Sequence, residues 1–256
     1  MKDLFTLKGK VAIVTGGNGG IGKGIARGFA GVGGDIVIAA RNRAKTAKAA
    51  EEIKKESGVR VLEVEVDVRQ ESQINAMARK VLDTFGRIDI LVNNAGMNIR
   101  KMPQELSAAE YDEVVETNLR SAFLCSQAAY PAMKEAGGGK IINIGSMLSI
   151  FGGAKLLAYG ASKGGVVAMT RSLAVAWAGD NIQVNAILPG WVNTELTKRA
   201  RVEIEGLHER ILARTPVGRW GEPDELQGAA IFLASPASDY ITGVALPVDG
   251  GFSIMV

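Results

Sequence analysis

The sequence predicts an α/β fold in which a seven-stranded parallel sheet carries helices on both faces. Short β-branched and aliphatic runs alternate along the chain with longer amphipathic segments, and this alternation is typical of a doubly wound sheet. A glycine-rich loop separates the first apolar run from the first amphipathic segment. The 256 residues, 47% hydrophobic and 22% charged, predict one globular domain over residues 1–256.

The apolar runs give the strands in order: 11–15, 36–40, 59–68, 88–92, 141–144, 182–188 and 244–248. The amphipathic segments between them predict helices at 21–29, from the second strand to near 58, at 70–85, 107–133 and 158–178, and after Pro223. Gly86 is a typical helix end, and Ser107 with Glu110 forms a capping-box pattern at the start of the long fourth helix.

Composition excludes several classes of protein. The chain has one cysteine, Cys125, and one histidine, His208, so neither an internal disulfide nor a zinc site of clustered His and Cys is expected, and we predict no metal. A net charge of +3 is too small to indicate nucleic acid. Neither a signal peptide nor an apolar run of membrane-spanning length is evident. We therefore expect a cytoplasmic protein with no membrane partner.

The loop after the first strand indicates dinucleotide binding. Gly17, Gly19 and Gly22 form the pattern G-x-G-x-x-G between a predicted strand and a predicted helix. Glycines in this setting allow a tight turn, and the helix N-terminus favours the negative charge of a pyrophosphate. The alternative is a loop that only connects strand and helix. The context favours a Rossmann-type cofactor site.

The end of the second strand indicates which cofactor is bound. An NAD site usually places Asp or Glu here to bind the ribose 2′-hydroxyl, whereas this chain has Arg41 followed by Asn42. A guanidinium can hold a 2′-phosphate through paired hydrogen bonds. We therefore predict NADP(H) as the preferred cofactor, with NAD(H) possible if Arg41 is only a solvated residue at a helix start.

A candidate catalytic group follows the fifth strand. Ser146 follows that strand, and Tyr159 and Lys163 are four residues apart on the next predicted helix, so their side chains share one face. A phenol with a pKa near 10 is a weak base at neutral pH, and a neighbouring ammonium lowers that pKa. The trio predicts proton exchange with an alcohol or carbonyl.

These motifs together resemble the single-domain short-chain dehydrogenase/reductase family over essentially the whole chain. The matching residues are TGGNGGIG at 15–22, Asp67-Val68, NNAG at 93–96, Asn118, Ser146, Tyr159, Lys163 and Pro189-Gly190. The resemblance implies that Tyr159 is the acid/base, that Ser146 hydrogen-bonds the substrate oxygen, and that Lys163 binds the nicotinamide ribose. Asn118 would hold a water that relays protons from Lys163.

The resemblance also implies the cofactor contacts. Asp67 and Val68 would contact the adenine, and Val192 and Thr194 would contact the carboxamide. With the residues discussed above, the expected cofactor-binding set is Gly16, Asn18, Gly20, Ile21, Gly22, Arg41, Asn42, Asp67, Val68, Asn94, Gly96, Tyr159, Lys163, Pro189, Val192 and Thr194.

The substrate is less constrained by the sequence. Basic residues occur on the three segments expected to border the pocket, and Arg100 is the best candidate to hold a carboxylate, unless these residues are simply solvated. The stretch from Ser146 to Gly153 resembles gluconate and 2-deoxy-gluconate dehydrogenases. Leu148 and Trp191 would also suit a more apolar ketone, as in 3-oxoacyl-carrier-protein reductases. Trp191 could instead be a packing residue.

We expect an oxidoreductase that transfers hydride between NADP(H) and a secondary alcohol or ketone, possibly a sugar or sugar acid. The alternatives are an NAD-dependent sugar-acid dehydrogenase, a 3-oxoacyl-carrier-protein reductase, and a nucleotide-sensing protein without turnover. A pure sensor has no need of all four residues Asn118, Ser146, Tyr159 and Lys163. The family resemblance implies a homotetramer built partly from the helices at 107–133 and 156–179.

Overall fold

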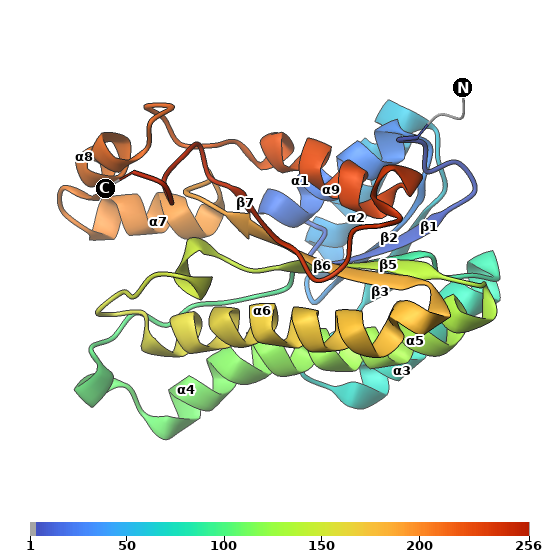
Figure 1. Ribbon diagram of the computed structural model, residues 1–256, viewed down its shortest axis with the longest axis horizontal. Helices are drawn as coiled ribbons and strands as arrows, with labels where there is room; N and C mark the ends of the chain where they lie inside the picture. Colours follow the sequence, from blue (N-terminus) through green and yellow to red (C-terminus); the bar gives the residue numbers. More distant parts are fainter. Residues whose placement is uncertain (1–3, 256) are drawn as a thin grey trace.

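The computed structural model describes residues 4–255, and its centre is a seven-stranded parallel sheet, as predicted. The sheet order is β3-β2-β1-β4-β5-β6-β7 (Figure 1). Residues 1–3 and 256, which the predicted domain includes, lie outside the described residues. The strands are β1 (Val11–Thr15), β2 (Asp35–Ala40), β3 (Val61–Glu65), β4 (Ile90–Asn93), β5 (Gly139–Ile144), β6 (Ile182–Pro189) and β7 (Ala245–Val248).

The strands form where consecutive apolar side chains can be buried on both faces of the sheet. All residues of β1, β4 and β6 are buried, which a parallel sheet covered by helices requires. The predicted third strand, 59–68, is shorter in the structure than in the sequence analysis. The order reverses at β1, which pairs with β2 on one side and β4 on the other. A crevice opens at such a switch point, beyond the carboxyl ends of the strands.

The helices form two layers, one on each face of the sheet (Figure 1). One layer holds α1, α2 and α9, and the other holds α3, α4, α5 and α6; α7 and α8 extend beyond the carboxyl ends of the strands. Every helix among residues 4–255 is too short or too polar to cross a membrane. The helices are α1 (Gly20–Gly31), α2 (Arg43–Ser57), α3 (Glu71–Phe85), α4 (Ala108–Val115), α5 (Ser121–Glu135), α6 (Leu157–Trp177), α7 (Glu195–Glu203), α8 (Leu207–Arg214) and α9 (Gln227–Ala234).

The helix predicted at 107–133 departs from the prediction in its middle. It begins at the predicted capping box, where Ser107 and Glu110 cap each other. Between α4 and α5 the chain forms a π-helical turn, η2 (Glu116–Arg120), without leaving the helix. Such a turn inserts one residue per turn, and it is often found at functional sites. Here it carries Thr117 and Asn118, both buried.

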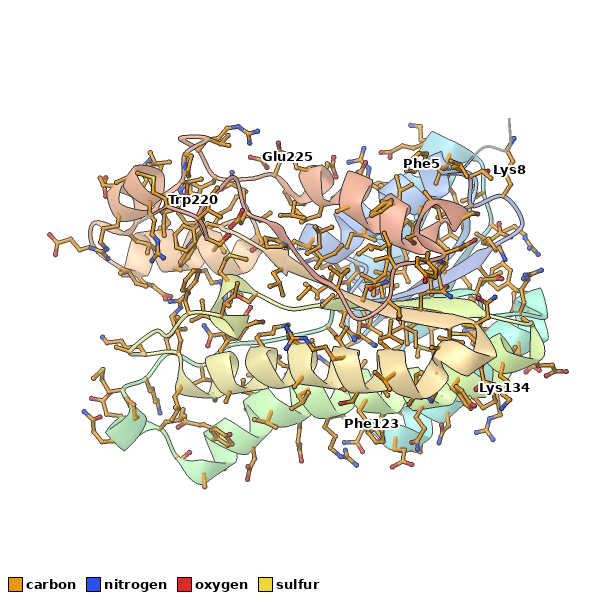
Figure 2. The ribbon with its side chains drawn as sticks, viewed as in Figure 1. Phe5, Lys8, Phe123, Lys134, Trp220 and Glu225 are labelled. Carbon is orange, nitrogen blue, oxygen red and sulfur yellow. The ribbon has the colours of Figure 1, made fainter. Side chains whose placement is uncertain are left out.

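Residues 195–214, which form α7 and α8, are named here the α7–α8 segment. They cover a separate apolar cluster whose centre is the buried Trp220 (Figure 2). The Arg201 guanidinium carbon lies 3.9 Å from the Trp220 ring centre, and the indole nitrogen donates a hydrogen bond to His208 Nδ1. This segment therefore has its own small core, set apart from the two large cores that flank the sheet.

Candidate active site

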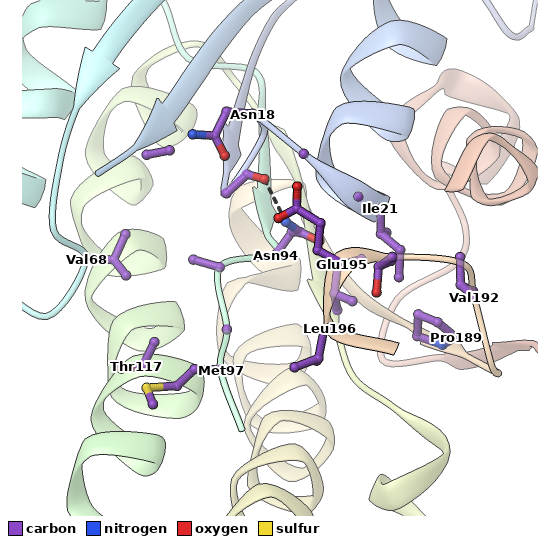
Figure 3. Close-up of a pocket in the computed structure, with 18 of the residues that line it drawn as sticks. Asn18, Ile21, Val68, Asn94, Met97, Thr117, Pro189, Val192, Glu195 and Leu196 are labelled. Atoms are coloured by element: carbon purple, nitrogen blue, oxygen red, sulfur yellow. Dashed lines mark hydrogen bonds between the residues drawn. The ribbon is translucent and has the colours of Figure 1, made fainter. Parts of the chain in front are cut away.

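A pocket of about 560 Å³ lies at the carboxyl ends of the strands, under the start of α7 (Figure 3). Its walls come from the glycine loop, the ends of β2 and β3, the segment after β4, the end of β5, α6 and the segment after β6. The predicted residues that line it are Gly16, Asn18, Gly20, Ile21, Arg41, Asn42, Asp67, Val68, Asn94, Gly96, Ser146, Tyr159, Lys163, Pro189, Val192 and Thr194.

The glycine loop is held open by close packing against Asn94. Asn94 Nδ2 donates to the carbonyls of Thr15 and Gly16, at 2.9 and 3.3 Å. A Cβ on Gly22 would lie 2.5 Å from the Gly16 carbonyl oxygen and would also collide with the Asn94 amide. Gly22 therefore lies behind the pocket lining, where it lets helix and loop approach each other, while the rest of the loop faces the pocket.

Two features of the pocket fit a dinucleotide. Helix α1 begins at Gly20 without a side-chain cap from the described residues, so its first N–H groups are available to a phosphate. Thr117, on the π turn, presents a buried Oγ1 that has no hydrogen-bond partner within residues 4–255. A buried polar atom without a partner is costly, and a polar ligand in the pocket would supply one.

The pocket wall at the ends of β2 and β3 carries charged side chains. Arg41 is exposed at the end of β2, and its charge contributes to lowering the pKa of Asp67. The largest cause of that lowered pKa is a hydrogen bond from Arg69, 2.7 Å from the carboxylate. Arg69 thus holds the Asp67 carboxylate, while Arg41 is exposed and lines the pocket. Asn42 caps α2 through a hydrogen bond from the Lys45 amide.

Ser146, Tyr159 and Lys163 meet at the floor of the pocket. Tyr159 and Lys163 lie one turn apart on α6, with the Lys163 Nζ 5.7 Å from the Tyr159 ring centre. Lys163 is buried, and its Nζ donates to the Ile144 carbonyl at 2.7 Å. Burial lowers the pKa of the Lys163 ammonium to about 8. Ser146 lies at the end of β5, and its hydroxyl accepts a hydrogen bond from the Leu148 amide.

Burial is the largest influence on the pKa of Tyr159. Burial raises the pKa of the Tyr159 phenol, because the phenolate loses solvation. A hydrogen bond with Ser146 and the positive charge of Arg100 oppose that rise. The Lys163 ammonium lies 5.7 Å from the Tyr159 ring centre and donates to the Ile144 carbonyl. Ser146 and Arg100 therefore stabilise the phenolate in this structure.

Asn118 does not line the pocket but lies directly behind it. Its side chain accepts from the Met97 amide at 2.8 Å and donates to the Met97 carbonyl and the Ser162 hydroxyl. A Cβ on Gly96 would lie 3.2 Å from Asn118 Oδ1 and 3.6 Å from Lys163 Nζ. Gly96 therefore lies between the Asn118 amide and the Lys163 ammonium, and because it has no side chain it takes up little space between them.

The three further substrate candidates lie outside the pocket lining. Arg100 is half-buried and close enough to Tyr159 to affect its pKa; burial lowers the pKa of the Arg100 guanidinium itself, against the opposing charges of Glu203 and Tyr159. Trp191 packs edge-on against Trp220, with ring centres 5.3 Å apart. Leu148 follows Ser146 in the short turn η3 (Met147–Ser149).

Two other basic residues of these segments have partners within the protein. Lys101 pairs with Glu110 at 2.5 Å, and Arg201 stacks on Trp220 while bonding to Asn193. Among these basic residues, Arg100 is close enough to Tyr159 for its charge to lower the pKa of the phenol.

Several lining residues escaped the sequence analysis: Lys45, Met97, Thr117, Glu195, Leu196 and Thr197. Figure 3 shows Glu195 and Leu196 reaching from the start of α7 into the pocket. Thr197 belongs to the cap of α7, where its amide donates to the Thr194 hydroxyl. The T-x-x-T spacing was the available signal for this helix start.

Comparisons with known proteins identify the family of this chain. The family model described as enoyl-(acyl carrier protein) reductase, a model of short-chain dehydrogenases, matches residues 16–253. The chain is 45% identical to 2-dehydro-3-deoxy-D-gluconate 5-dehydrogenase of Escherichia coli K12, over 97% of each chain. It is 41% identical to 5-keto-D-gluconate 5-reductase of the same organism over 100% of each chain.

A solved structure is also closely similar. The gluconate 5-dehydrogenase of Burkholderia cenocepacia J2315, crystallised with NADP and tartrate, superposes with a TM-score of 0.94. It is 40% identical to this chain, and the match covers 99% of both chains.

Proposed function

The chain belongs to the short-chain dehydrogenase/reductase family of NAD(P)-dependent oxidoreductases, and we propose that it interconverts a secondary hydroxyl and a ketone on a sugar acid with NADP(H). The observation that carries the substrate class is Arg100. A half-buried guanidinium beside the Tyr159 phenol can hold a substrate carboxylate near the reacting carbon. The gluconate-type relatives support the same class.

In the proposed mechanism, Tyr159 moves the proton. During oxidation its phenolate accepts the hydroxyl proton, and during reduction its phenol donates a proton to the ketone oxygen. Ser146 hydrogen-bonds the same oxygen and stabilises the phenolate. Lys163, on the other side of Gly96 from Asn118, would relay protons to solvent through a water held by Asn118. The bound nicotinamide supplies or accepts the hydride.

The cofactor would lie along the pocket from the glycine loop to Tyr159. The start of α1 and the loop around Asn18 would hold the pyrophosphate, and Thr117 would gain a partner for its hydroxyl. Arg41 would bind the 2′-phosphate. The absence of an acidic residue at this position, where an NAD enzyme usually places one, supports NADP over NAD.

Side-by-side fluorescence titration of NADPH and NADH tests the cofactor. We expect tighter binding of NADPH, and Arg41→Asp should weaken NADPH binding far more than NADH binding. Equal losses would refute the role of Arg41, and binding of neither cofactor would refute the proposed function.

Turnover with 5-keto-D-gluconate, an uncharged ketone of similar size and an acetoacetyl thioester tests the substrate class. We expect the highest kcat/KM with the sugar acid. Preference for the thioester would indicate an acyl reductase instead.

We further propose that residues 1–256 act as one cofactor-binding and catalytic domain, in the cytoplasm, as a homotetramer. The exposed apolar side chains of Phe123 on α5 (Figure 2) and Val175 on α6 support assembly through these helices. The free, buried thiol of Cys125 is consistent with a reducing compartment. Sedimentation equilibrium would test the tetramer.

A further inference from the structure

An ion pair joins two opposite walls of the pocket. Lys45, in the first turn of α2, and Glu195, the first residue of α7, both line the pocket. The Lys45 Nζ lies 3.0 and 2.9 Å from the two carboxylate oxygens of Glu195. A Cβ on Gly19 would lie 2.9 Å from the same Nζ. The Lys45 ammonium therefore bridges the glycine loop, the start of α2 and the start of α7.

The position of Lys45 suits a phosphate. It lies four residues after Arg41, so both cations reach the pocket from the end of β2 and the start of α2. Two carboxylates line this pocket, Asp67 and Glu195. Asp67 is bound by Arg69, which leaves Glu195 as the carboxylate that neutralises Lys45.

We propose that Lys45 is a second cation for the cofactor 2′-phosphate and that Glu195 is its competitor within the chain. This inference rests on the proposed use of NADP(H). When the phosphate binds, Lys45 exchanges the Glu195 carboxylate for the phosphate oxygens, while Arg41 binds the same group. Glu195 thus lowers the affinity for NADP(H) and leaves the affinity for NAD(H) unaffected.

The exchange is physically reasonable because the resident pair is weak. The Glu195 side chain is 82% exposed and that of Lys45 is 40% exposed. Ion pairs exposed to this degree contribute little to stability, whereas a phosphate carries up to two charges and three acceptor oxygens. The hydrogen bond from Lys45 lowers the pKa of Glu195, so the carboxylate is charged throughout the neutral range.

Binding of NADPH, NADH and adenosine 2′,5′-bisphosphate tests the proposal without any turnover. Lys45→Gln should weaken NADPH and bisphosphate binding about tenfold and leave NADH unchanged, because it removes one charge-assisted contact to the phosphate. Glu195→Gln should strengthen NADPH and bisphosphate binding about two- to fivefold, the size expected for release of an exposed ion pair. When Lys45→Gln is already present, adding Glu195→Gln should not change the affinity for NADPH or for the bisphosphate.

Two control variants remove the same charges elsewhere. The first is Lys48→Gln, at an exposed position of α2, and the second is Glu209→Gln, at an exposed position of α8. Both residues lie outside the pocket lining. Neither should change the ratio of NADPH to NADH affinity.

Specific outcomes would overturn the proposal. If Lys45→Gln weakens NADH as much as NADPH, Lys45 binds a group common to both cofactors, such as the pyrophosphate. If Glu195→Gln leaves NADPH binding unchanged, Glu195 is not a competitor. Failure of the proposed function is distinguishable, because the wild-type chain would then bind neither cofactor or would prefer NADH before any substitution is made.

Discussion

The floor of the pocket and its rim are held by different kinds of interaction. The floor, at the ends of β4 and β5 and along α6, is a buried network. Asn93 Nδ2 donates to Asn143 Oδ1 at 2.8 Å, and Asn143 Nδ2 donates to Thr170 Oγ1 at 2.9 Å. Asn143 is 0% exposed. This network joins β4, β5 and α6 and so fixes the helix that carries Tyr159 and Lys163.

The rim is held mainly by exposed charges and by contacts between the α7–α8 segment and the Trp220 ring. Lys45 and Glu195 link α2 to α7, and Arg201 lies against Trp220. Buried hydrogen bonds are costly to break, whereas exposed ion pairs are exchanged with little cost. From this difference we expect the floor to keep Tyr159 and Lys163 in place and the rim to rearrange more easily when a ligand binds.

Removal of the reacting hydroxyl should have the largest effect. Tyr159→Phe should lower kcat by about 10²–10⁴-fold, the usual contribution of general acid–base catalysis, and leave NADPH binding near wild type. Steady-state kinetics and nicotinamide fluorescence measure the two quantities. Tyr130→Phe is the matched control, because it removes a tyrosine hydroxyl that lies outside the pocket and is bonded to Asp180. Full turnover by Tyr159→Phe would disprove the mechanism.

Breaking the buried network should cost stability. Asn143→Ala removes two buried hydrogen bonds, one from Asn93 and one to Thr170, so it should lower the free energy of unfolding by about 2 kcal/mol. Asn93 keeps its bond to the Ser126 hydroxyl, and Thr170 keeps its bond to the Val166 carbonyl. Urea denaturation measures this change. Asn75→Ala, on the exposed face of α3, should change it by less than about 0.5 kcal/mol. Similar effects from both would mean that the floor is no more rigid than the surface.

The buried Lys163 should make the stability of the floor depend on pH. Its pKa is about 8 in the folded chain, below the ordinary value of 10.5, so the unfolded chain binds more protons between these values. The stability that wild type gains over Lys163→Met is therefore greatest above pH 10.5 and is lost as the pH falls through 8. The expected change is on the order of 2 kcal/mol. Urea denaturation of both proteins from pH 7 to 10 measures it, and a constant difference would contradict the shift.

Arg100→Gln should affect the binding of an acidic substrate more than the rate of the reaction. We expect KM for a sugar acid to rise about tenfold, with little change for an uncharged ketone, because one charge-assisted contact to the carboxylate is lost. Lys155→Gln, an exposed residue on the neighbouring segment, should leave both values unchanged. An equal loss for both substrates would mean that Arg100 acts on the Tyr159 phenol and does not bind the substrate carboxylate.

The floor was also the more predictable region. Each strand is an apolar run because both faces of a parallel sheet are covered, and the glycine loop and the spacing from Ser146 to Lys163 are local patterns. The rim depends on pairs that are distant in sequence. Lys45 and Glu195 are 150 residues apart, and no periodicity joins them. Trp191 could not be assigned from the sequence because its packing partner, Trp220, lies on another loop.

The π turn η2 shows why the local sequence pattern did not predict the shape of the helix at 107–133 in full. The residues of 107–133 suit an unbroken α-helix, and nothing in their spacing marks Glu116–Arg120 as wider. The wider turn is compatible with the surrounding contacts, since Asn118 bonds to Met97 and Ser162. Tertiary contacts of this kind are not visible in a local pattern.

The same turn determines how this enzyme tolerates insertions and deletions. One residue in an α-helix corresponds to about 100° of rotation, so the extra residue of η2 sets the facing of α5 relative to α4. Deleting a single codon there would restore a regular helix and turn Phe123, Cys125 and the rest of α5 to new faces. A protein engineer who shortens this helix by one residue would therefore misalign either the Asn118 amide or the whole outer layer. A deletion of the same length in an exposed loop would be absorbed locally.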